Sequence, residues 1–109
     1  MDCPKCETPS LKATVHKGVE VDRCEQCRGI WFDDRELAEL LNLPTKELRS
    51  LDSGNQDELL NLKRGRCPRD GSDLLRVYSP DNHDIVLDAC VNCSGVWLDG
   101  GELLKLSKS

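Results

Sequence analysis

Apolar and polar residues alternate along two stretches near the start of the chain. The stretch 11–16 alternates as a half-buried strand does, and the stretch 19–22 alternates in the same way after Lys17-Gly18. A glycine between two such runs is typical of a β-hairpin turn. The pattern then changes to the i, i+3, i+4 spacing of a helix, carried by Leu37, Leu40 and Leu41. We therefore expect a hairpin followed by a helix.

The same order of patterns recurs in the second half of the chain. Its first strand-like stretch places Leu75 and Val77 where the first half has Leu11 and Ala13. The return stretch places Ile85 and Leu87 where the first half has Val19 and Val21. A short last helix follows, with Leu103, Leu104 and Leu106. The pattern predicts a second hairpin with a longer turn, around 80–83. The alignment predicts that its strands face inward at the positions that match those of the first hairpin.

A sequence repeat accompanies the repeated pattern. Cys24-Glu-Gln-Cys-Arg-Gly-Ile-Trp-Phe-Asp-Asp-Arg-Glu-Leu37 returns as Cys90-Val-Asn-Cys-Ser-Gly-Val-Trp-Leu-Asp-Gly-Gly-Glu-Leu103. In each copy an Asp stands three residues before a Glu, which predicts a capping box at a helix start: Asp33 with Glu36, and Asp99 with Glu102. A repeat of this kind indicates two copies of one structural unit.

The repeat divides the chain of 109 residues into three parts. Residues 1–43 form the first unit, residues 67–109 form the second, and residues 44–66 form a connector of two short amphipathic helices. Units this small bury too little apolar surface to fold alone, and they need a metal or disulfides. The predicted fold class is a small, metal-stabilised α+β fold.

The cysteines of the first unit predict a zinc site. Two Cys-x-x-Cys pairs, which we call knuckles, flank its hairpin in the sequence, one before the first strand and one after the second: Cys3, Cys6, Cys24 and Cys27. Each knuckle offers two sulfurs from one tight turn, and two knuckles complete the tetrahedron that Zn²⁺ prefers. The chain has seven cysteines, and this odd number fits a disulfide framework poorly. With four thiolate ligands the zinc would be structural.

The second unit predicts a second zinc site with one change of ligand. Its candidate ligands are Cys67, Asp70, Cys90 and Cys93. Asp70 stands where the repeat has a cysteine, and a carboxylate oxygen can bind zinc. Two alternatives stay open at this point: His83, which lies in the expected hairpin turn, or a water molecule could complete the site.

The motifs of both units resemble those of the transcription factor IIB-type zinc-ribbon family. The resemblance rests on Cys-Pro-x-Cys, a hairpin, and then Cys-x-x-Cys-x-Gly-hydrophobic-Trp-hydrophobic-Asp-x-x-Glu-Leu. It implies two tandem zinc ribbons, each a β-hairpin with cysteine knuckles and a C-terminal helix. Asp70 departs from the family pattern, which has a cysteine there. The connector has no counterpart in the resemblance.

The two tryptophans allow two interpretations. Trp31 and Trp97 are expected to pack between hairpin and helix as the main core residue of each unit, because small cores depend on aromatic side chains. The alternative exposes them as anchors for a partner, since tryptophan is favoured at binding hot spots.

Charge and composition narrow the function classes. The formal net charge is −5, which disfavours nucleic acid unless basic residues are segregated. One basic cluster could form such a patch: Lys63, Arg64, Arg66 and Arg69. The chain shows no apolar run that could span a bilayer and no signal peptide, so we expect a cytoplasmic protein with no membrane contact.

These observations favour a non-enzymatic adaptor that binds a protein partner or a second copy of itself, with no small-molecule substrate. The alternative is a nucleic-acid-binding ribbon that uses the basic cluster. A third class, redox or electron-transfer chemistry at the cysteines, would require iron or exchanging disulfides. Asp70 speaks against an all-thiolate iron site in the second unit.

Overall fold

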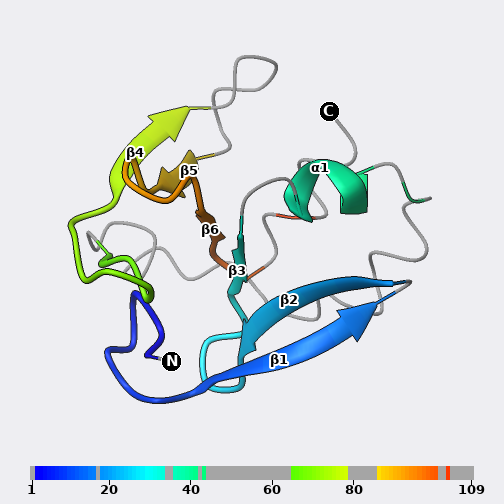
Figure 1. Ribbon diagram of the computed structural model, residues 1–109. Helices are drawn as coiled ribbons and strands as arrows, with labels where there is room; N and C mark the ends of the chain where they lie inside the picture. The colour runs from blue at the N-terminus through cyan, green and yellow to red at the C-terminus, as the bar shows by residue number, and fades with distance from the viewer. Residues whose placement is uncertain are drawn as a thin grey trace.

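The structure is a computed structural model, and it describes residues 2–16, 18–33, 36–41, 43, 65–78, 86–100 and 103. In chain order the elements are β1 (Leu11–His16), β2 (Val19–Cys24), β3 (Ile30–Phe32), α1 (Glu36–Leu41), β4 (Leu75–Tyr78), β5 (Val86–Ala89) and β6 (Val96–Leu98) (Figure 1). No helix among these residues is long and apolar enough to cross a membrane.

The two units share one antiparallel sheet. The strand order is β1-β2-β3-β6-β5-β4, so the third strand of each unit lies in the middle (Figure 1). At this junction Trp31 of β3 pairs with Trp97 of β6. The repeated strands therefore lie symmetrically about the Trp31–Trp97 pair, and the units pack together rather than hanging apart on the connector.

Both predicted hairpins are present, each with its strands paired antiparallel. In the first hairpin β1 runs from Leu11, which pairs with Cys24, to His16, which pairs with Val19. The sheet thereby places the end of β2, where the second knuckle starts, beside the chain that leaves the first knuckle. The expected turn of the second hairpin at 80–83, which includes His83, lies outside the described residues, and so does Ile85 of the expected return strand.

The alignment proposed for strand β4 is wrong by one residue. Leu74 is 1% exposed and belongs to the same buried cluster as Leu11, whereas Leu75 and Val77 are 48% and 45% exposed. The segment from the first cysteine of the unit to this buried leucine is one residue shorter in the second unit. Because successive side chains of a strand point to opposite faces, that single deletion moves Leu75 and Val77 to the other face.

Each face of the sheet carries one buried apolar cluster. The first cluster joins residues of the sheet to the helical segments: Val19, Val21, Ile30, Phe32, Leu40, Leu98 and Leu103. The second lies on the opposite face and includes cysteines of both units together with Leu11, Trp31, Leu74 and Trp97. Both clusters draw on both units, so the described residues of the two units share their cores.

The tryptophans are buried as expected, but on the other side of the sheet. Trp31 and Trp97 are both 0% exposed, which rules out the interpretation of exposed anchors. They lie in the cluster with the cysteines, not in the cluster with Leu40 of helix α1. The alternation along β3 explains this placement, because Ile30 and Phe32 take the helix side and Trp31 must point to the opposite side.

Helix α1 begins where the capping box predicts a helix start. The carboxylate of Glu36 accepts a hydrogen bond of 2.7 Å from the backbone N–H of Asp33, as that motif requires. The Asp33 carboxylate was expected to accept from the first-turn amides. Its partners among the described residues are instead the indole of Trp31 and the guanidinium of Arg69.

Two expected helical parts fall largely outside the described residues. Residues 44–64 of the connector are not described, and neither are Glu102 and residues 104–109 of the last helix. Leu103 is described, in helical conformation and fully buried in the helix-side cluster. The end of the connector is described as well, and Arg66 there makes an antiparallel bridge with Asp73.

Candidate metal centres

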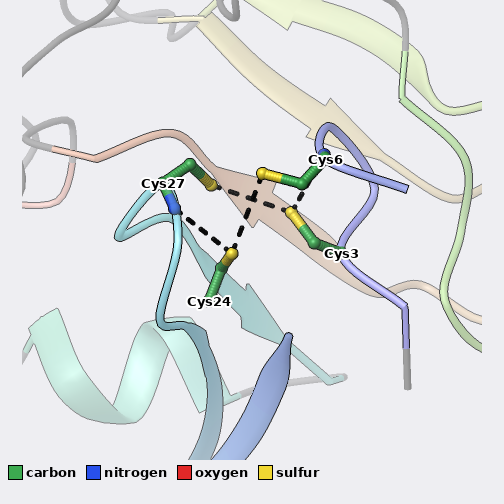
Figure 2. Close-up of side chains that lie close together, drawn as sticks. All are labelled: Cys3, Cys6, Cys24 and Cys27. Atoms are coloured by element: carbon green, nitrogen blue, oxygen red, sulfur yellow. Dashed lines mark hydrogen bonds between the residues drawn. The ribbon is translucent and has the colours of Figure 1, made fainter. Parts of the chain in front are cut away.

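The four cysteines of the first unit converge at one end of the β1–β2 hairpin. Their side chains point toward one another from two turns (Figure 2), and their sulfurs all lie within 4.8 Å of one another. The Sγ atoms of Cys3 and Cys27 are 3.7 Å apart, and those of Cys6 and Cys24 are 4.0 Å apart. With Zn–S bonds of about 2.3 Å, a tetrahedral zinc site has sulfurs about 3.8 Å apart. The cluster fits a four-thiolate zinc ion.

Backbone groups hold the sulfurs of this site in place. The N–H of Cys6 points at the Sγ of Cys3, and the N–H of Cys27 points at the Sγ of Cys24, each at 3.3 Å. The chain can turn this tightly because Glu7 and Arg28, just after each knuckle, take positive φ values of 58° and 66°. These N–H groups stabilise negative charge on sulfur, which suits a thiolate bound to a metal.

Thiols packed this closely do not all ionise without a cation. Burial raises the pKa of Cys6 to about 12, and a hydrogen bond with Cys27 together with burial raises the pKa of Cys3. The same hydrogen bond lowers the pKa of Cys27 to about 6, so the proton is retained on its partner. A divalent ion removes this conflict, because it stabilises four thiolates at once.

Acid is therefore expected to release zinc. Cys6 and Cys67 keep their protons up to about pH 12 in the folded arrangement, and thiols in an unfolded chain keep theirs up to about pH 8.5. In either state zinc displaces protons at neutral pH, and its affinity falls as the pH falls. Because more than one proton leaves each site, we expect a loss steeper than about tenfold per pH unit. Competition with a chelator of known pH dependence, between about pH 8 and 5, measures it; a flat profile would contradict the expectation.

The second unit brings together three cysteines in the equivalent place. The ligand atoms of Cys67, Cys90 and Cys93 lie within 4.8 Å of one another, and Cys67 and Cys93 have their sulfurs 3.6 Å apart. Burial raises the pKa of Cys67 to about 12. Ser94, which follows this knuckle as Arg28 follows its counterpart, repeats the positive φ at 64°. The two cysteine clusters together fit two zinc sites, the second with three thiolates.

Asp70 lies at the edge of the second cluster. Its Oδ2 is 3.6 Å from the Sγ of Cys90, close to the separation of two ligands on one zinc ion. Its Oδ1 accepts hydrogen bonds from the backbone N–H and the hydroxyl of Ser72, which lower the pKa of the carboxyl. Asp70 is exposed, and its carboxylate is not part of the group of ligand atoms, those of Cys67, Cys90 and Cys93, that all lie within 4.8 Å of one another. Its role as fourth ligand stays a prediction, and the alternative ligand His83 lies outside the described residues.

Replacing Asp70 tests that role. Asp70→Ala is expected to weaken zinc binding at the second site by about tenfold or more, because a three-thiolate site would have only water to complete it. The matched control is Asp73→Ala, an exposed aspartate of the same loop outside the cluster. Zinc per chain after a graded chelator challenge measures the effect. Equal retention of the second zinc by wild type and Asp70→Ala would remove Asp70 from the ligand set.

Sequence reasoning missed a set of ion pairs beside the metal centres. Lys5 is the third residue of the knuckle Cys3–Cys6, and Arg69 is the third residue of its counterpart Cys67–Asp70, which we also call a knuckle. Each forms ion pairs with aspartates of the other unit. The repeat held the signal, since both copies have a basic residue at this knuckle position. The repeat gives no distances between the units, so the aspartate partners of these residues could not be predicted.

Comparison with known proteins supports the repeat. The family model described as transcription factor zinc-finger matches residues 2–43 and, a second time, residues 66–109. No curated protein and no solved structure matches the chain.

Proposed function

Because this chain belongs to the transcription factor zinc-finger family, with two tandem copies of its zinc ribbon, we propose that it is a non-enzymatic binding module whose zinc ions are structural. The observation that carries the proposal is the first cysteine cluster. Its four thiols are placed as a full tetrahedral shell, and such a shell leaves no position on the metal for a substrate. Zinc of this kind stabilises the fold, and the folded protein provides the surface that a partner binds.

The partner that we propose is a protein, bound in the reducing cytoplasm. All seven cysteines are free and belong to the two clusters, as a reducing compartment allows. The net charge of −5 favours a partner with a basic surface. Exposed apolar side chains at several positions in the described part of the chain could add to such contacts: Val15, Leu75, Val77 and Val91.

The alternative is a nucleic-acid-binding module, which the family name favours. Of the basic cluster, Lys63 and Arg64 lie outside the described residues, and Arg66 is exposed. Arg69 forms a two-pronged ion pair with Asp33, so its charge is already compensated within the protein. This pairing weakens the basic patch, and we rank the protein partner first.

A direct binding comparison separates the two functions. Zinc-loaded protein is titrated against DNA and RNA oligonucleotides by fluorescence anisotropy, at low salt and at physiological salt. The proposal expects no binding that survives physiological salt, together with a stoichiometric, zinc-dependent complex with a purified protein recovered by affinity capture. Salt-dependent nucleic-acid binding that Lys63→Glu, Arg64→Glu and Arg66→Glu abolish together, while the exposed Lys12→Glu retains it, would establish the alternative.

A further inference from the structure

Lys5 of the first unit is buried, and its charge is paired with aspartates of the second unit. Its side chain is 0% exposed, and its Nζ lies 3.3 Å from Asp88 and 3.5 Å from Asp99. Asp88 lies on β5 and Asp99 follows β6, so both aspartates belong to the second unit. A buried cation is costly unless it is paired, and here two aspartates of the other unit compensate it. The first knuckle thus depends on the folded second unit.

Arg69 of the second unit makes the reciprocal connection. Its Nε lies 3.0 Å from the Oδ1 of Asp33, and its Nη2 contacts Asp33 and, at 3.8 Å, Asp22. Asp22 is the counterpart of Asp88 in the repeat, and Asp33 is the counterpart of Asp99. This pair is more open, since the arginine side chain is 47% exposed. Each N-terminal knuckle therefore places one cation on an aspartate pair of the other unit.

The tryptophans cross between the units in the same way. A Cβ placed on Gly29 would lie 2.2 Å from the ring of Trp97, and one on Gly95 would lie 2.1 Å from the ring of Trp31. Each ring therefore rests directly on the glycine of the other unit.

Each of these glycines is positioned by a knuckle. The carbonyl of Gly29 accepts a hydrogen bond from the N–H of Cys24, and that of Gly95 accepts one from the N–H of Cys90, both at 2.9 Å. Cys24 and Cys90 are also members of the two sulfur clusters. Whatever orders the sulfurs of one unit thus orders the surface on which the other unit's tryptophan packs.

From these four crossed contacts we propose that the two zinc sites are thermodynamically coupled, so that zinc at either site strengthens zinc binding at the other. A metal ion bound between the two knuckles of one unit holds in place a basic side chain, Lys5 or Arg69, and a glycine, Gly29 or Gly95. The other unit contacts both, through its aspartate pair and its tryptophan. Loss of that ion releases both contacts and loosens the opposite unit, including its own sulfurs. The coupling is reciprocal, as linkage requires.

Removing one site at a time in the full chain tests the coupling. Cys90→Ser with Cys93→Ser disables the second site, and the zinc affinity of the first is measured by competition with a chromophoric chelator. Cobalt substitution gives an independent readout through its thiolate charge-transfer bands. We expect the remaining site to bind about tenfold more weakly or worse than the same site in the wild type, within the usual range of coupling between sites. Cys24→Ser with Cys27→Ser should do the same to the second site. Unchanged affinities in both variants would overturn the proposal.

A second set of variants keeps every cysteine and Asp70. Lys5→Met lies in the first unit, but its contacts are in the second, so it is expected to weaken zinc at both sites. Arg69→Gln, at a more exposed position, should lower affinity at the first site although the residue belongs to the second unit. The matched control is Lys12→Met, whose exposed ion pair with Glu25 stays within the first unit. If Lys5→Met and Arg69→Gln each affect only the site of their own unit, the units are independent and the proposal fails.

Discussion

Removing zinc is expected to unfold both units together. The apolar clusters on the two faces of the sheet are small, and one of them is built around the metal-binding cysteines themselves. Without metal the crowded thiols must hold protons, and the knuckles that position Gly29 and Gly95 lose their restraint. For small domains of this kind the free energy of metal binding is largely the free energy of folding, about 10 kcal/mol or more per structural zinc.

The measurement combines circular dichroism with tryptophan emission during titration with a chelator. Both tryptophans are fully buried, so unfolding should shift their emission to longer wavelength while the sheet signal disappears. Adding Zn²⁺ back should restore both signals, and Mg²⁺ should not, because thiolates select soft or borderline metals. A protein that metal analysis shows to be free of zinc, yet which keeps its sheet and its blue emission, would contradict the expectation.

The second large effect is expected at the glycines beneath the tryptophans. Gly29→Ala would place a methyl group 2.2 Å from the ring of Trp97, a distance that no packed atoms tolerate. Gly29 directly precedes β3 and Trp97 lies on β6, and both residues are buried, so the ring cannot swing into solvent. We expect a loss of about 3 kcal/mol in the free energy of unfolding at saturating zinc, the upper part of the usual range for overpacking. Denaturant titration at a fixed zinc excess measures it.

The crossed geometry gives this prediction an internal control. Trp97→Leu should relieve the clash, so the double variant with Gly29→Ala should be more stable than the sum of the two single losses. Trp31→Leu should give no such relief, because the ring of Trp31 rests on Gly95. Relief by Trp31→Leu instead would mean that each tryptophan packs on the glycine of its own unit.

Local features of the fold could be predicted because they depend on residues close in sequence. Alternation predicted the two strands of the first hairpin, and the Asp–Glu spacing predicted the start of helix α1 at Asp33 and Glu36. The positions of the cysteines predicted the cluster of the first unit, because knuckle geometry is local and a hairpin brings its ends together. These elements need no knowledge of the other unit.

Errors arose where a residue's environment comes from distant parts of the chain. Leu75 and Val77 carry the alternation of an inward-facing strand, but the one-residue deletion before β4 and its pairing with β5 place Leu74 inside instead. Asp33 carries the right spacing for a cap, yet Trp31 and Arg69 use its carboxylate. In both cases the sequence pattern fits more than one arrangement, and contacts made in the folded protein selected among them.

The sequence by itself determined that the chain has two copies of one zinc-ribbon motif, with cysteines spaced for two metal sites, since these facts follow from motif and spacing alone. Only the tertiary structure decided that the copies form one sheet and exchange their key contacts. In the sequence Lys5 gives no sign of a partner and Arg69 belongs to a candidate basic patch, while Trp31 and Trp97 look like the core of their own units. They act across the junction because each unit is too thin to bury a tryptophan alone, and the symmetric pairing of β3 with β6 places the other unit within reach.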